Sequence, residues 1–194
     1  TDAVKVRFNL RRGLAIDALW FKEISDAWLC GTLHHGYYDD INWGADYYTG
    51  HLVFESLGYR RITDLEPVVG VAVVAGTEAG NGSEATSLYY DHCIDAVRIQ
   101  ATMPLPCGKL LKRFCIQTVG DNPYVEIDYH LEWSKPMIGS LRLGYITLNP
   151  DAFSQADLFY ATHNGGYDLE YFPISEPINH GDAVSFMISA KQAL

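Results

Sequence analysis

The residues from 125 to 133 alternate strictly between two kinds of side chain, and this pattern constrains the fold more than any other feature of the chain. Every odd position carries an apolar or aromatic residue, whereas the even positions carry Glu, Asp, His and Glu. Successive side chains of a β-strand point to opposite faces of a sheet. The pattern therefore predicts an antiparallel strand with one face in a hydrophobic core and the other in solvent.

Similar patterns recur along the whole chain. Residues 4–10 also alternate, and Arg11, Arg12 and Gly13 then predict a turn into a second strand over residues 14–21, which gives an N-terminal hairpin. A helical apolar pattern is short and confined to residues 22–29, where we expect one short helix. The remaining predicted strands span residues 51–56, 60–65, 68–75, 87–91, 94–103, 110–118, 141–148, 157–162, 168–173 and 183–189.

This order of elements predicts an all-β fold. Units in which strands and helices alternate are absent, so a parallel α/β enzyme fold is not expected. The expected architecture is a large antiparallel two-sheet β-sandwich with few short helices, and a barrel is the alternative. The chain has 194 residues, which fit a single domain over residues 1–194. Because residue 1 is Thr and no leader follows, we expect the chain to be part of a longer protein.

Charge and composition exclude several classes of partner. A composition of 48% hydrophobic and 20% charged residues is ordinary for a soluble globular domain. The net charge of -10 repels a phosphate backbone, so nucleic acid is not expected as a partner. The longest apolar stretch, residues 68–75, is too short for a membrane helix. The four cysteines, at positions 30, 93, 107 and 115, form no CxxC pair; we expect buried free thiols and a reducing, cytoplasmic compartment.

The segment from residue 30 to residue 55 carries the strongest signal for a binding site. It does not alternate like a strand, and it is dense in aromatic rings, imidazoles and carboxylates. Aromatic faces stack on sugar rings, while carboxylates and imidazoles bind hydroxyls. The simpler interpretation is a packed loop whose rings cap the sandwich. The predicted stacking residues are Tyr37, Trp43 and Tyr47, and the predicted polar contacts are His34, Asp39, Asp40 and Asp46.

Metal ions offer a further interpretation of the same loop. Asp39, Asp40 and Asp46 supply the hard oxygen ligands that calcium prefers, but their spacing matches no EF-hand, so calcium is only an alternative to the expectation of no cofactor. Zinc is rejected, because the adjacent His34 and His35 point in opposite directions on extended backbone and do not easily share one ion with His51.

Acid/base chemistry requires a histidine and a carboxylate that converge on one substrate. His51 and Glu55 are the candidate pair; His34, His130 and His163 are alternatives for the histidine, and Glu126, Glu132 and Glu170 for the carboxylate. The polar row from Glu126 to Glu132 is more typical of a solvated strand face. A second candidate binding segment is the glycine turn at 164–166, after which Asp168 and Glu170 share one face of a predicted strand; Glu170 is its predicted ligand contact. A tight hairpin with outward polar residues is the simpler interpretation.

Several segments together resemble a known family. The hairpin VRFNLRRGLAI at residues 6–16, the block 111–133, the run 139–149, NGGYDLE at 164–170 and HGDAVS at 180–185 resemble the large β-sandwich of galactose-mutarotase-like proteins. In particular, they look like the C-terminal sandwich of multidomain glycoside hydrolases of the α-mannosidase and family 57 types. The resemblance implies a carbohydrate-associated domain whose catalytic carboxylates lie on a separate barrel. The histidine and glutamate of stand-alone epimerases are not matched to positions here.

Three functions follow as expectations. The first is a carbohydrate-binding or substrate-positioning sandwich of a glycoside-hydrolase-like protein, with an oligosaccharide as partner. The second is a stand-alone mutarotase-like epimerase or lyase that uses a His/carboxylate pair. The third is a structural module that packs on a catalytic domain or on a second copy of the chain.

The first function predicts that Trp43→Ala weakens sugar binding, because the variant removes a stacking surface. The purified chain is screened on a glycan array, and each hit is titrated by tryptophan fluorescence. We expect saturable binding that Trp43→Ala weakens. Binding that is unchanged in the variant would remove Trp43 from the site.

Overall fold

The computed structural model describes residues 3–33, 48–57, 61–75, 96–118, 122–162, 167–174 and 187–190, and this part of the chain consists of strands and two short 3₁₀ helices. The prediction of an all-β chain with few short helices is confirmed. The helices are η2 (Pro150–Ala152) and η3 (Gln155–Asp157). The strands are β1 (Val4–Asn9), β2 (Ala15–Phe21), β3 (Cys30–Gly31), β4 (Leu52–Ser56), β5 (Ile62–Thr63), β6 (Ala72–Ala75), β7 (Val97–Leu105), β8 (Gly108–Gln117), β9 (Tyr124–Trp133), β10 (Gly139–Leu143), β11 (Leu158–Thr162), β12 (Glu170–Pro173) and β13 (Met187–Ala190).

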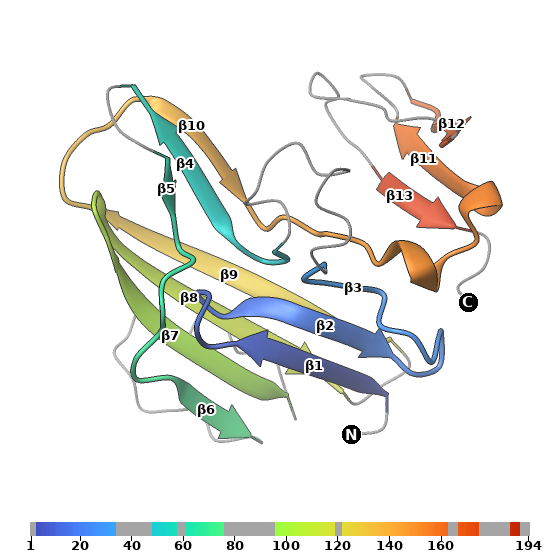
Figure 1. Ribbon diagram of the computed structural model, residues 1–194, viewed down its shortest axis with the longest axis horizontal. Helices are drawn as coiled ribbons and strands as arrows, with labels where there is room; N and C mark the ends of the chain where they lie inside the picture. Colours follow the sequence, from blue (N-terminus) through green and yellow to red (C-terminus); the bar gives the residue numbers. More distant parts are fainter. Residues whose placement is uncertain are drawn as a thin grey trace.

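Hydrogen bonding divides these strands among four antiparallel sheets, where the sequence predicted two. Their strand orders are β1-β2-β3, β10-β4-β5, β6-β7-β8-β9 and β12-β11-β13 (Figure 1). The alternating segment at 125–133 lies in β9, which pairs with β8 from Gly108↔Trp133 to Gln117↔Tyr124. The predicted strand at 87–91 lies outside the described residues.

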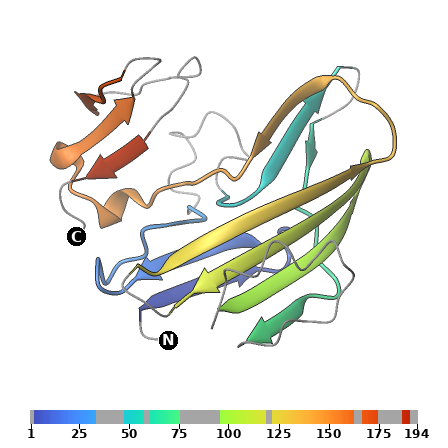
Figure 2. The same ribbon diagram turned by 180° about the vertical axis from the view of Figure 1, so that it is seen from behind.

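The hydrophobic core lies on one face of the four-stranded sheet. Phe114 and Ile116 of β8 pack with Leu14 and Ile16 of the first sheet, and Leu110 of β8 packs in a second cluster with residues of β4 and β5. Positions 110, 114 and 116 of β8 share one face. The sheets β1-β2-β3 and β10-β4-β5 therefore cover the same face of the large sheet (Figure 2).

The sheets β1-β2-β3 and β10-β4-β5 meet along their edges. Isolated bridges join Ile16 to Thr49 and Cys30 to Leu148. The Thr49 hydroxyl donates to the carbonyl of Gly31 at 2.7 Å and accepts from the amide of Thr147 at 3.0 Å. One buried side chain therefore ties β3, the segment before β4 and the segment after β10 together.

The short helix predicted at residues 22–29 is wrong. Residues 22–24 form a turn, in which the amides of Ile24 and Ser25 donate to the carbonyl of Phe21. The Ser25 hydroxyl accepts from the amide of Ala27 at 3.0 Å, and the amide of Leu29 already pairs with Leu19 of β2. A serine that bonds nearby backbone competes with a helix, and the strand pairing leaves too few residues for one. No helix in the described part of the chain is long and apolar enough to cross a membrane.

The cysteines differ from the expectation of four free thiols. Cys30 and Cys107 are free and buried, but Cys115 of β8 is disulfide-bonded. Sequence alone does not reveal which cysteines pair when no spacing motif is present. Disulfides persist in oxidising compartments, so the expectation of a reducing compartment loses its support.

A buried ion pair joins three parts of the fold. The Lys112 ammonium of β8 lies 2.9 Å from the Asp64 carboxylate, and both side chains are fully buried. The ammonium also donates to the carbonyl of Gly13 at 2.8 Å, while Asp64 accepts from the amide of Leu52 at 2.9 Å. At Gly13 a Cβ atom would overlap the backbone carbonyl of Asp64, so the close approach requires glycine. The pair thus links the β1–β2 turn, the residue after β5 and the start of β4 to the large sheet.

We expect Lys112→Met to lower the free energy of unfolding by about 3–5 kcal/mol, because it leaves the Asp64 carboxylate buried without its cation. Adding Asp64→Asn removes that charge and restores part of the loss. Urea denaturation measures both variants. The matched control is Lys109→Met on the exposed face of β8, which we expect to change stability by less than about 0.5 kcal/mol. Equal stability of Lys112→Met and the parent chain would contradict this account.

Candidate functional site

Most of the predicted loop site lies outside the described residues. This holds for His34, Tyr37, Asp39, Asp40, Trp43, Asp46 and Tyr47, and for the alternatives His35 and His163. The candidate pair His51 and Glu55 lies at β4, and the ligand candidate Glu170 lies on β12, so these described residues occupy two separate regions.

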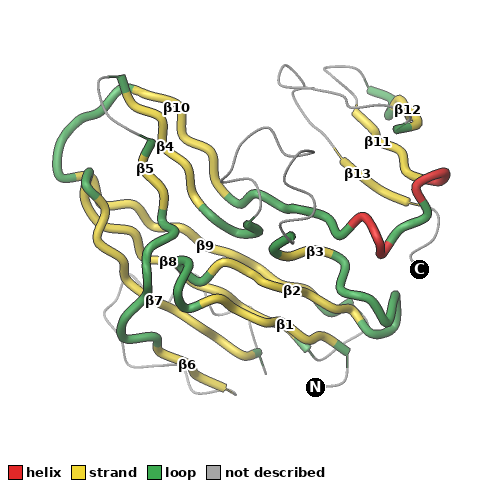
Figure 3. The backbone as a smooth tube through the Cα atoms, in the orientation of Figure 1, coloured by secondary structure: helices red, strands yellow, loops and turns green. Residues whose placement is uncertain are grey.

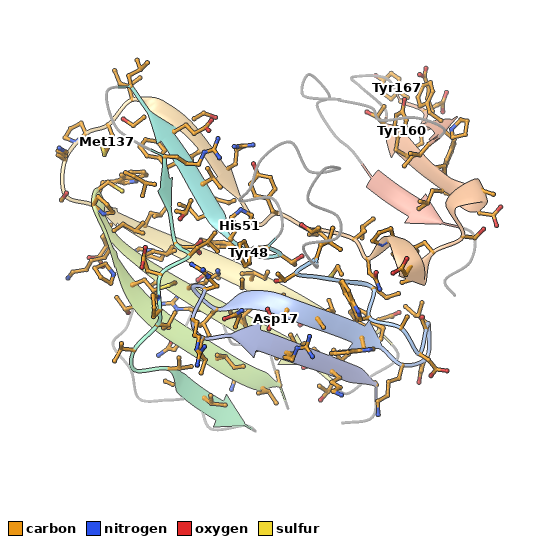
Figure 4. The ribbon with its side chains drawn as sticks, viewed as in Figure 1. Asp17, Tyr48, His51, Met137, Tyr160 and Tyr167 are labelled. Atoms are coloured by element: carbon orange, nitrogen blue, oxygen red, sulfur yellow. The ribbon has the colours of Figure 1, made fainter. Side chains whose placement is uncertain are left out.

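His51 immediately precedes β4 and is fully buried, at 0% exposure (Figure 4). Its Nδ1 lies 2.6 Å from the carbonyl oxygen of Tyr48. A carbonyl oxygen only accepts hydrogen bonds, so Nδ1 carries the proton and Nε2 carries a lone pair. The Nε2 atom is buried and has no hydrogen-bond partner among the described residues. The imidazole is therefore held in one tautomer, and its acceptor nitrogen has no partner within the part of the chain that the structure describes.

A row of stacked groups leads from His51 toward the surface. The Tyr145 ring stacks on the imidazole with centroids 4.7 Å apart, and the Arg142 guanidinium lies 5.2 Å from the centre of the Tyr145 ring. Arg142 in turn lies 3.7 Å from the carboxylate of Glu55, which Arg61 also contacts at 2.7 Å. Among the described residues, His51 and Glu55 are linked through Tyr145 and Arg142 and do not contact each other.

His51 and Glu55, the two candidates in this row, have different electrostatic surroundings. Burial lowers the pKa of His51 below its ordinary value, and the Tyr48 carbonyl and the Asp64 carboxylate oppose that shift. The ring is therefore neutral near pH 7, and Nε2 is available as an acceptor or a base rather than as an acid. Glu55 lies between two guanidiniums, a typical environment for a structural carboxylate. The arrangement does not provide the pair of groups facing one substrate that acid/base catalysis requires.

The core contains three polar residues that sequence reasoning missed. Besides Lys112 and Asp64, the hydroxyl of Tyr129 is buried without a partner among the described residues, and burial raises the pKa of this phenol. The Lys112 ammonium lies 5.6 Å from the centre of the Tyr129 ring. A signal for Lys112 was present in the sequence, because it occupies an inward position between Leu110 and Phe114 of one strand.

The second region is β12 together with the bend before it. All residues from 167 to 173 are exposed, and Tyr167 is completely so. Tyr171 is 61% exposed and tilts against Phe159 of β11 at 5.6 Å, while Phe172 is 36% exposed and stacks on Tyr160 at 5.0 Å. Glu170 opens the strand opposite Thr162. Asp168 lies in the bend, not on the strand face that the sequence predicted. Aromatic rings and a carboxylate are therefore presented to solvent on one edge strand.

Other candidates have simpler environments. His130 and Glu132 lie 3.9 Å apart on β9 and are both well exposed, which fits a solvated strand face. No group of three His, Cys, Asp or Glu residues that could hold a metal ion occurs in the described ranges. The calcium candidates lie outside these ranges. A cavity of about 350 Å³, lined by Ala3, Phe21, Glu23, Ile24, Asn122 and Pro123, contains none of the predicted site residues.

The buried imidazole predicts a pH dependence of stability. The folded-state pKa of His51 is lowered, so below pH about 7 the unfolded chain binds more protons than the folded one. The stability that the neutral ring provides is present at higher pH and is lost as pH falls through the folded-state pKa. We expect urea unfolding between pH about 7.5 and about 5.5 to show a larger loss in the parent chain than in His51→Gln. His130→Gln, at an exposed site, is the control and should follow the parent; parallel curves for all three chains would refute the assignment.

Comparison with known proteins identifies no relative. No family model matches the chain, and no curated protein or solved structure shows significant similarity to it. The resemblance to galactose-mutarotase-like sandwiches therefore stays a prediction from the segments quoted above. Any statement about function depends on the geometry of the chain itself.

Proposed function

We propose that this protein is a carbohydrate-binding β-domain that binds an oligosaccharide on the exposed segment 167–173. The supporting observation is the run of seven consecutive exposed residues, which includes two tyrosines, one phenylalanine and two carboxylates. Soluble proteins usually bury such rings, and their exposure on one strand indicates a binding surface.

The chemistry of the segment suits a sugar ligand. The ring faces of Tyr167 and Tyr171 are apolar, and each ring carries a polar hydroxyl at its edge. Such faces stack on the C–H-rich face of a pyranose. Glu170 and Tyr171 are consecutive in β12 and point to opposite faces, so the carboxylates of Glu170 and Asp168 accept hydrogen bonds from other hydroxyl groups of the oligosaccharide. Because segment 167–173 is exposed and ends in the edge strand β12, the ligand lies along a surface and is not enclosed.

Substrate positioning is the function that this surface supports, rather than turnover. The described contacts of Glu55 with two arginines, and the complete burial of His51, offer no open pair of catalytic groups. The epimerase or lyase alternative therefore stays a prediction from sequence. The loop residues Tyr37, Trp43 and Tyr47 are a separate predicted contact, which the Trp43→Ala experiment addresses.

A structural module is the second candidate function, and one observation favours it. Strand β10 is an edge of its sheet (Figure 3), and apolar side chains on it and next to it face solvent. These are Ile138, Leu141, Leu143 and Ile146, of which Ile138 is 78% exposed. An exposed apolar edge is typical of a surface that packs on another domain or on a second copy of the chain.

The binding proposal predicts that Tyr167→Ala weakens the binding of an array-identified oligosaccharide about threefold to tenfold, because one stacking surface is lost. Isothermal titration calorimetry on the full chain measures the change. Tyr124→Ala, an exposed tyrosine on β9, is the matched control and should bind like the parent. Tyr167 is fully exposed, so its loss is not expected to disturb folding.

Two results would contradict the proposal. Equal binding by Tyr167→Ala and the parent would place the site elsewhere. Absence of binding to every glycan, together with self-association at high concentration in analytical ultracentrifugation, would favour the structural module.

A further inference from the structure

The described residues of the sheet that carries the proposed site, and those flanking it, include acidic side chains but no lysine or arginine. In the described residues of β11, β12 and β13, Glu170 is the one charged side chain, and the flanking residues Asp157 and Asp168 are also acidic. No lysine or arginine occurs in residues 157–162, 167–174 or 187–190. The net charge of the whole chain is -10, so nothing in the overall composition offsets this local excess.

Three carboxylates on other described strands, Asp17, Glu55 and Asp128, have arginine partners. Asp128 lies 3.1 Å from Arg113, and Glu55 lies 2.7 Å from Arg61. Asp17 lies 3.8 Å from Arg7. In contrast, Asp168 and Glu170 make no ion pair or hydrogen bond through their side chains within the described part of the chain. These two carboxylates, which have no partner among the described residues, lie in the same seven-residue segment as the exposed rings of Tyr167 and Tyr171.

We propose that the preferred ligand of this surface is an oligosaccharide that carries free amines, that is, a glycan built from 2-amino sugars; this inference rests on the proposed function above. An ammonium group donates up to three hydrogen bonds and pairs with a carboxylate. It is also attracted to the faces of tyrosine rings, whose quadrupole favours cations. Both kinds of group on the segment therefore favour a cationic sugar over a neutral one, and both disfavour a sugar that carries carboxylate or sulfate.

The experiment compares three oligosaccharides of equal length on the full chain: a glucosamine oligomer with free amines, the same oligomer N-acetylated, and a glucuronate-containing oligomer. At low ionic strength we expect the free-amine oligomer to bind about fivefold to tenfold more tightly than the acetylated one, and the glucuronate oligomer to bind most weakly. Added salt should reduce the difference, since exposed charges are screened.

Variants assign the preference to particular residues. Glu170→Gln combined with Asp168→Asn should weaken binding of the free-amine oligomer more than binding of the acetylated one, so that the two oligomers then bind with equal affinity. Glu132→Gln, an exposed carboxylate on β9, is the matched control and should keep the full preference.

The outcomes separate this inference from the function on which it rests. Equal affinity for the amine and acetylated oligomers would overturn the inference and leave sugar binding intact. A preference that persists in the double variant would assign it to the overall negative charge and overturn the proposed role of the two carboxylates. Failure of all three oligomers to bind, alongside an array without hits, would refute sugar binding itself.

Discussion

The Lys112–Asp64 ion pair is the interaction on which the rest of the fold depends. A lysine at an inward position of β8 is costly to bury, and burial indeed lowers the pKa of its ammonium while the Asp64 carboxylate opposes that shift. The site compensates the cost with a carboxylate, a backbone carbonyl and a backbone amide from three different segments. Apolar contacts do not depend on direction, whereas these hydrogen bonds and this ion pair require one specific arrangement of the segments. They fix where the hairpin turn and the start of β4 sit above the large sheet.

The exposed segment 167–173 lies outside the core that this ion pair anchors. Both core clusters are built from the three sheets that the ion pair connects, and they contain no residue of β11, β12 or β13. The third small sheet lies to one side in both views of the fold (Figures 1 and 2). Its rings pack in pairs across β11 and β12 instead of against the large sheet. The exposed segment 167–173 and these two core clusters therefore share no residue.

Sequence reasoning recovered the strands because a period of two is a local property. Residues 4–10 and 125–133 alternate clearly, and each corresponds to an observed strand. The same reasoning failed where distant contacts decide the outcome. The segment 22–29 has a short helical pattern, but pairing of Leu29 with Leu19 overrides it. The division into four sheets depends on partners far apart in the chain, which alternation does not specify.

The candidate site was predictable only in part, for a similar reason. Glu170 was recognised from its strand pattern, and its exposure agrees with a surface role. His51 was chosen for its chemistry, yet its complete burial follows from Tyr145 and Tyr48, which no local pattern links to it. The disulfide at Cys115 and the charge at Lys112 likewise depend on neighbours that are remote in sequence.

Hydrogen bonds between residues far apart in the sequence also affect how the chain folds during synthesis. The bond from Lys112 to Gly13 spans 99 residues, and the bonds from Thr49 to Thr147 span 98. At a ribosomal rate of roughly 5–20 residues per second, the N-terminal hairpin waits about 5–20 s before its lysine partner emerges. During that interval its apolar face lacks the sheet that covers it. Topologies with such distant contacts fold slowly, because the entropy of closing a long loop is lost before the contacts form.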